Sequence, residues 1–192
     1  AQGGGATGFY RYSISGNTWV GSATSNLASA PGAVGTGAQM LRNSADDTIY
    51  VAQGNTLTGF YSYSISGNTW TTLAVVPTAV STGAQMIRNG SDNTIYLVGG
   101  NQAGGFYSYS ISGNTWTTLA AVPAGVHNGG QMIRNGSDNT IYLVPGNYTT
   151  NFYSYSISAN TWTTLAVVPG AVGVGAQMIR NSSDNTIYLA RG

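Results

Sequence analysis

The chain has 192 residues and a formal net charge of +1, and its only charged side chains are six arginines and five aspartates. This balance provides no basic field for a polyanion, so nucleic acid is not an expected partner. No apolar run approaches the roughly 20 residues that a membrane-spanning helix needs, and the absence of cysteine excludes disulfides and thiolate chemistry. The low charge and the many Ser, Thr and Asn residues favour an extracellular or cell-surface location.

One segment occurs four times in the chain. The stretch GFYSYSISGNTWTTLAVVP at 59–77 returns almost unchanged at 105–123 and 151–169, and in altered form at 8–31. The spacing of equivalent phenylalanines is 51, 46 and 46 residues, and the excess of five in the first copy is the insert SATSN. A repeat of this length is one supersecondary unit. The single domain of residues 1–192 therefore divides into repeats at about 9–59, 60–105, 106–151 and 152–192, with 1–8 completing the last.

Within each repeat the pattern predicts four short strands. FYSYSI at 60–65 alternates apolar and polar residues with the period of two of a pleated strand, and it turns through SGN into TWTTL at 69–73. GAQMIRN at 83–89 then turns through GSDN into TIYLV at 94–98. The turns carry the Gly, Asn and Asp residues that tolerate positive φ. Four strands per repeat are typical of a propeller blade, so the prediction is an all-β propeller of four four-stranded antiparallel blades.

The repeated motif resembles the kelch-repeat β-propeller family. IYLVGG at 95–100 matches the apolar strand that ends in a glycine pair, and Tyr63, Asn68 and Trp70 match the Tyr, Asn and Trp that follow. The full glycine pair occurs only at 99–100, and Ser64 stands where kelch repeats usually have an acidic residue. The ligand chemistry of particular kelch proteins is therefore not carried over. The same spacing recurs at Tyr12, Asn17 and Trp19, at Tyr109, Asn114 and Trp116, and at Tyr155, Asn160 and Trp162.

The resemblance also implies closure of the propeller by pairing of its terminal strands. Residues 1–9 match 52–60, and 188–192 match 50–54, so both ends fall in the same loop of the repeat. We expect the strand around Phe9 to Ser13 to lie beside that around Thr186 to Leu189. The closure is expected within one chain or between two chains that form an eight-bladed ring, and the third alternative is that the residues are an excerpt of a longer array.

Repeats 60–105 and 106–151 differ at 11 of 46 positions, and the differences fall in two loops. Six lie at 75–84 and its counterpart 121–130, and five lie at 99–105 and its counterpart 145–151. Because antiparallel strands alternate in direction, both loops should emerge on one face, opposite the copied SGN and GSDN turns. Variation there indicates either a ligand surface or simple drift of tolerant loops. The candidate contact residues are Tyr148, Asn147, His127, Asn128, Asn101 and Gln102.

Two recurring groups have structural interpretations. Arg88 and Asp92, with their counterparts, are expected to form a local ion pair or an aspartate-capped turn rather than an anion site. Tyrosines such as Tyr63 are expected to pack between blades with their hydroxyl groups bonded at the rim.

The sequence favours a non-catalytic module. It offers no Ser-His-Asp set, paired carboxylates or metal-ligand cluster, so no enzyme activity, metal or cofactor is expected. The leading hypothesis is an extracellular binding module whose variable loops contact a carbohydrate or a protein. The alternatives are a structural repeat unit of a surface assembly or filament, or a duplicated or designed propeller scaffold without a ligand. A homo-oligomer in which two chains form an eight-bladed ring is a further possible assembly.

Overall fold

A computed structural model describes residues 4–21 and 26–192, and every regular element in those ranges is a β-strand. Most of the SATSN insert, residues 22–25, lies outside the described residues. Over the described ranges no helix has the length and apolar character needed to cross a membrane. The strands are β1 (Tyr10–Ser13), β2 (Thr18–Gly21), β3 (Gln39–Asn43), β4 (Thr48–Ala52), β5 (Phe60–Ser64), β6 (Thr69–Thr72), β7 (Gln85–Asn89), β8 (Thr94–Val98), β9 (Phe106–Ser110), β10 (Thr115–Thr118), β11 (Gln131–Asn135), β12 (Thr140–Val144), β13 (Tyr153–Ser156), β14 (Thr161–Thr164), β15 (Gln177–Asn181) and β16 (Thr186–Ala190).

The copied turns are held by their own polar side chains. In the SGN turn the Ser64 hydroxyl accepts a hydrogen bond from the Gly67 N–H at 3.1 Å, and Asn68 takes a φ of 50°. In the GSDN turn the Asp92 carboxylate accepts the Thr94 N–H at 3.1 Å, and Asn93 takes a φ of 55°. Asn tolerates this left-handed conformation better than most residues, so the local sequence specifies each hairpin.

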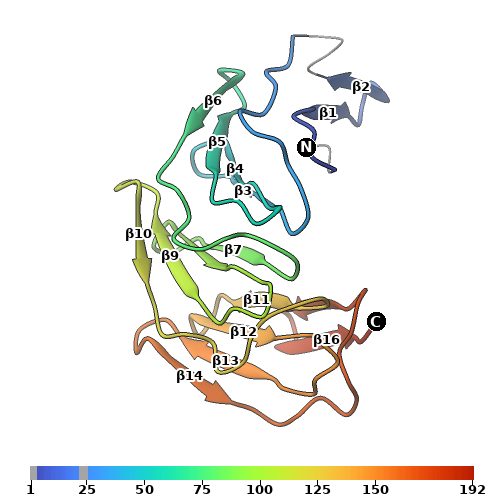
Figure 1. The fold of residues 1–192 in the computed structure, drawn as a ribbon, viewed down its shortest axis with the longest axis vertical. Helices are drawn as coiled ribbons and strands as arrows, with labels where there is room; N and C mark the ends of the chain where they lie inside the picture. The colour runs from blue at the N-terminus through green and yellow to red at the C-terminus, as the bar shows by residue number, and fades with distance from the viewer. Residues whose placement is uncertain (1–3, 22–25) are drawn as a thin grey trace.

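Within residues 4–21 and 26–192, the strands form three complete antiparallel sheets and two half-sheets. The complete sheets have the orders β3-β4-β5-β6, β7-β8-β9-β10 and β11-β12-β13-β14, and they are called the first, second and third units. The pairs β1-β2 and β15-β16 are two-stranded half-sheets at the two ends. The first strands of successive units, β3, β7, β11 and β15, contact one another in turn, so they lie on the inner side of the arrangement. Figure 1 shows these sheets following one another along an open arc. The predicted all-β fold with repeated four-stranded antiparallel sheets is confirmed.

The expected closure within one chain is not formed. β1 pairs with β2 and β16 pairs with β15, and the two pairs belong to separate sheets. Both lie at the open side of the arc in Figure 1. The successive contacts between sheets are nearly identical, with 4.9 Å between the rings of Phe60 and Tyr109 and again between Phe106 and Tyr155. The turn between neighbouring sheets adds up to less than a full circle, so the two half-sheets stay apart in Figure 1.

An aromatic and hydrogen-bonded contact joins each sheet to the next. The ring of Phe60 lies 4.9 Å from Tyr109 and 5.1 Å from Trp116 of the following unit. The Asn114 side-chain oxygen accepts the Tyr109 hydroxyl at 2.9 Å and the Ala74 N–H at 2.8 Å. Trp116 Nε1 donates to the Ala74 carbonyl at 2.9 Å. The repeated Tyr, Asn and Trp therefore form the interface between sheets, as expected for these tyrosines.

Substituting Phe106 by Ala should destabilise the protein by about 3 to 5 kcal/mol, since a fully buried aromatic ring would be lost from this interface. Equilibrium urea unfolding followed by Trp fluorescence measures the effect. Ile14→Ala is the matched control because Ile14 is exposed, and it should change the midpoint little. Equal midpoints for the two variants would contradict the assigned core.

Stability should fall at high pH. Burial raises the pKa of Tyr96, Tyr109 and Tyr155 from 10.0 to about 12. Between these values the unfolded chain loses phenolic protons that the folded chain keeps, so the free energy of unfolding decreases as pH rises. Below pH 10 the contribution of these groups is complete. Urea unfolding between pH 8 and pH 11.5 measures the decline, and Tyr109→Phe should make it shallower. A constant free energy of unfolding over this range would refute the assignment.

Candidate functional site

The two variable loops of each unit share one face of the molecule. In the second unit, the Asn101 N–H donates to the Thr82 carbonyl at 2.8 Å, which joins the β8–β9 loop to the segment that leads into β7. The Gln102 N–H donates to the Val126 carbonyl of the following unit, also at 2.8 Å. The variable loops thus form a continuous hydrogen-bonded rim along the arc, as the antiparallel order predicts.

The structure brings four of the six candidate residues together in and beside the third unit. The Asn147 N–H donates to the Asn128 carbonyl at 2.9 Å, and the His127 N–H donates to the Pro145 carbonyl at 3.0 Å. Tyr148 follows Asn147 at the tip of the same loop. Asn101 and Gln102 belong to the preceding unit. The Gln102 N–H donates to the carbonyl of Val126, the residue before His127.

The tips of these loops hold ordinary side chains in a left-handed conformation. Thr56, Gln102 and Tyr148 have φ values of 61°, 62° and 58°, each following an Asn that is also left-handed. The N-terminal segment, which matches residues 52–60, has Gly5 in the corresponding place, with a φ of 80°. Glycine adopts such a φ without steric cost, whereas Thr, Gln and Tyr do so rarely and at a cost of order 1 to 3 kcal/mol. Three of the four tips therefore carry a side chain that local backbone geometry disfavours.

The side chains at the tips are available to a ligand. Tyr148 is 69% exposed, and Asn101, Gln102 and Asn147 are exposed as well. His127 and Asn128 are half-buried. His127 Nδ1 is buried and has no hydrogen-bond partner among the described residues. The candidate surface therefore offers one aromatic ring and several amides, whereas the unpaired imidazole nitrogen of His127 is not accessible on it.

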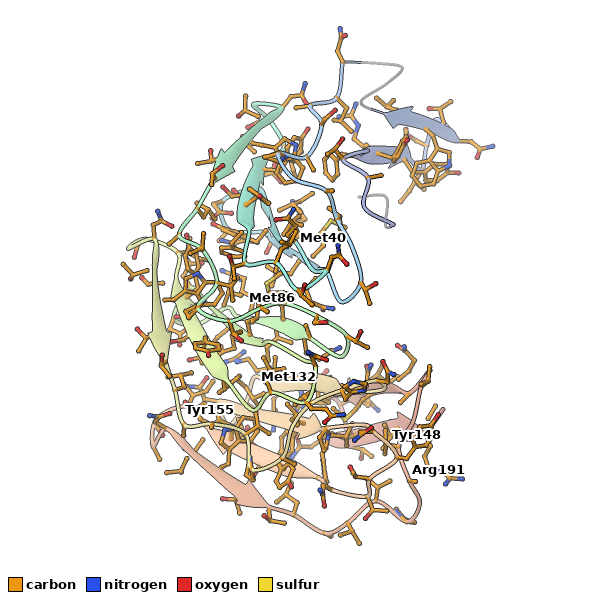
Figure 2. All side chains as sticks on the ribbon, in the orientation of Figure 1. Met40, Met86, Met132, Tyr148, Tyr155 and Arg191 are labelled. Atoms are coloured by element: carbon orange, nitrogen blue, oxygen red, sulfur yellow. The ribbon has the colours of Figure 1, made fainter. Side chains whose placement is uncertain are left out.

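Sequence reasoning missed Arg191. Its carbonyl accepts the Gly173 N–H at 2.9 Å, directly after Val172, whose carbonyl accepts the Tyr148 N–H at 2.8 Å. Figure 2 shows Tyr148 and Arg191 at the same end of the molecule. Arg191 is exposed, so it adds a cation near the tyrosine ring. The signal was present in the sequence, because this position changes in every repeat, as Gln53, Gly99, Pro145 and Arg191.

The copied GSDN turns are constrained by structure. Asn89 is fully buried, and its side-chain nitrogen donates to Asp92 at 2.7 Å and to Asn139 of the next unit at 3.2 Å. Its side-chain oxygen accepts the Ser91 N–H at 3.2 Å. A turn with these partners cannot drift without leaving buried polar groups unsatisfied. These buried partners explain the contrast between varied and copied faces without a ligand.

The two predicted roles of the repeated Arg and Asp residues, an aspartate-capped turn and a local ion pair, are both found. Asp92 caps its turn as expected, but Arg88 donates to the Asn93 side-chain oxygen at 2.8 Å instead of pairing with Asp92. In the first repeat the residue equivalent to Asn93 is Asp47, and Arg42 forms an ion pair with it at 2.7 Å. The physical reason is the register of the hairpin, which places position 93, and not position 92, beside the arginine.

No protein-family model matches the chain, and no similar sequence is found among the curated proteins. Within residues 4–21 and 26–192, no three His, Cys, Asp or Glu side chains gather as a metal site would require.

Replacing Gln102 by Gly should raise the stability by about 1 kcal/mol, because the strain of the left-handed tip is released while the backbone hydrogen bonds remain. Urea unfolding measures the gain. Gln85→Gly is the control, because Gln85 begins strand β7, where glycine weakens the sheet. Loss of stability in Gln102→Gly would show that the side chain itself supports the loop, and the strain argument would fail.

Proposed function

We propose that the chain is a non-catalytic binding module of the kelch type, which uses its variable-loop face to bind a carbohydrate. The observation that carries this proposal is the set of exposed, differing side chains at strained tips, at Thr56, Gln102 and Tyr148. Strained backbone positions cluster at functional sites, where the cost is offset elsewhere in the structure. Glycine would serve the loop equally well if only the turn mattered.

The chemistry of the face suits a neutral, polar ligand. An exposed tyrosine ring such as Tyr148 can stack on the apolar face of a sugar, and the amides of Asn101, Gln102 and Asn147 can donate to and accept from hydroxyl groups. A net charge of +1 gives no strong field that would select an ionic ligand. A protein partner is the second candidate, since tyrosine and arginine are enriched at protein interfaces and Arg191 lies near Tyr148.

The sheets supply the rigid scaffold that such loops need. We take them as blades of a β-propeller that is completed by pairing of its two half-sheets, as in the family that the sequence resembles. Few charges, no cysteine and a surface rich in Ser, Thr and Asn favour an extracellular or cell-surface location. Because each loop tip hydrogen-bonds to the next unit, the interfaces between sheets fix the spacing of neighbouring tips.

Tyr148→Ala should weaken carbohydrate binding by about 1 to 3 kcal/mol, the usual cost of removing a well-packed aromatic contact at a site. A glycan array identifies the ligand, and isothermal titration calorimetry measures the affinity of the two proteins. The matched control is Ser112→Ala in the copied SGN turn, on the opposite face, which should bind as the parent does.

The control also tests the choice of face. If Ser112→Ala weakens binding and Tyr148→Ala does not, the ligand lies on the copied face and the proposal is wrong. If no glycan binds and the chain captures no sugar polymer, the carbohydrate assignment fails.

A further inference from the structure

The two ends of the arc carry the two halves of a contact that occurs complete inside the chain. In each complete copy a Phe of one unit packs against a Tyr and a Trp of the next, as Phe106 does with Tyr155 and Trp162 at 4.9 Å and 5.1 Å. The Trp also bonds to a backbone carbonyl of the earlier unit, at Ala28, Ala74 or Ala120.

One half of this contact is exposed at the N-terminal end. Tyr12 and Trp19 are 42% and 69% exposed, whereas the equivalent Tyr109 is 1% exposed. The pair is already arranged as in the complete copies. The rings of Tyr12 and Trp19 are 5.1 Å apart, and the Tyr12 hydroxyl donates to the Asn17 side-chain oxygen at 2.6 Å.

The other half is exposed at the C-terminal end. Phe152 and Ala166 line an apolar groove of about 250 Å³ together with Met178, Ile187 and Leu189. In the complete copies this space is filled by the Tyr and Trp of the following unit. Ala166 is exposed and occupies the place of Ala74 and Ala120, whose carbonyls accept a Trp N–H.

The inner strands show the same division. Met40 in β3 is 55% exposed, while Met86, Met132 and Met178 are buried by the unit that precedes each of them. Figure 2 shows Met40, Met86 and Met132 following one another along the arc. At the opposite end, Tyr188 in β16 is 54% exposed, although its equivalents Tyr50 and Tyr96 are buried. Strand β3 therefore exposes the surface against which a preceding sheet would pack. Strand β16 exposes the surface against which a following sheet would pack.

We propose that a second copy of this chain fills both ends, so that two chains close one ring of eight blades. Strand β16 pairs with β1 of the second copy to give a sheet of order β15-β16-β1-β2. Trp19 and Tyr12 of the second copy enter the groove at Phe152, and the Trp19 N–H bonds to the Ala166 carbonyl. The contact is head to tail, and closed rings form when such a contact returns on itself.

The register of the mixed sheet follows from the complete sheets. Thr48 lies opposite Ser64, and Thr94 lies opposite Ser110, in the pairing of their second and third strands. The equivalent pair across the proposed contact is Thr186 with Ser13 of the second copy. The choice of two copies rests on the open side of the arc in Figure 1, at which both half-sheets lie. A second arc, turned by half a turn, meets both at once, and eight blades lie within the usual range for propellers.

A cysteine pair tests the contact directly, because the parent chain has no cysteine. Directly opposed residues of antiparallel strands have Cα atoms about 4.5 to 5.5 Å apart, which suits a disulfide. The double variant Ser13→Cys, Thr186→Cys should, after mild oxidation, migrate on a non-reducing gel at twice the mass of one chain. The control is Thr48→Cys with Ser64→Cys, which are opposed within one sheet and should crosslink without change of mass.

Each other outcome overturns the proposal. A crosslink within a single chain would show that the chain closes on itself. A ladder of masses would show open head-to-tail arrays, and the absence of any crosslink, with the control crosslinked, would show that the ends do not meet.

A mixing experiment tests the aromatic part of the contact without cysteines. Trp19→Ala and Phe152→Ala should each dissociate the dimer, giving at least a tenfold higher dissociation constant in sedimentation equilibrium. When the two variants are mixed, the heterodimer has one contact with both defects and one intact contact. It should therefore form more tightly than either variant alone. Equal weakness of the mixture and the separate variants would contradict the proposal, and loss of sugar binding at Tyr148 would not affect it.

Discussion

The aromatic and hydrogen-bonded contact between successive sheets is the interaction on which the rest of this structure depends. Phe60 of one unit packs against Tyr109 and Trp116 of the next, while the Asn114 side-chain oxygen joins the tyrosine hydroxyl to the backbone of the earlier unit. A single sheet of short strands buries too little apolar surface to be stable, so each unit depends on its neighbours. The spacing of Tyr, Asn and Trp is the same in each repeat because all three residues serve this one contact.

The same constraint separates the two faces. On the copied face, the buried Asn89 and its partners connect each turn to the next unit. Substituting Asn89 would leave buried polar groups without hydrogen-bond partners. On the opposite face, the connections between units use backbone hydrogen bonds, such as that from Gln102 to Val126. Backbone bonds do not depend on the side chain, so the tip residues are free to differ. The bonds between neighbouring units therefore account both for the copied turns and for the variable loops, which are free to differ.

The repeated contact also explains why both ends of the arc expose aromatic and apolar side chains. A chain of such units satisfies each internal interface and leaves one half-interface at each end, where Trp19 and Phe152 are not covered by equivalent neighbours within the described residues. Open sheet edges invite pairing with another chain. The two halves of this contact, the Tyr12–Trp19 pair and the groove at Phe152, therefore lie at opposite ends of the described arc.

The sequence alone determined the strands, their order and the residues between the sheets, because alternation, Asn and Gly turns and the Tyr-Asn-Trp spacing are local signals repeated four times. It also placed Tyr148 and Asn147 on the varied face, since strand direction follows from the antiparallel order. The tertiary structure decided whether the chain closes, because curvature depends on how side chains such as Phe60 and Tyr109 fit between sheets, which no local pattern encodes. It also revealed the left-handed tips at Thr56 and Gln102 and the place of Arg191. These depend on hydrogen bonds between units, and only the assembled fold brings those partners together.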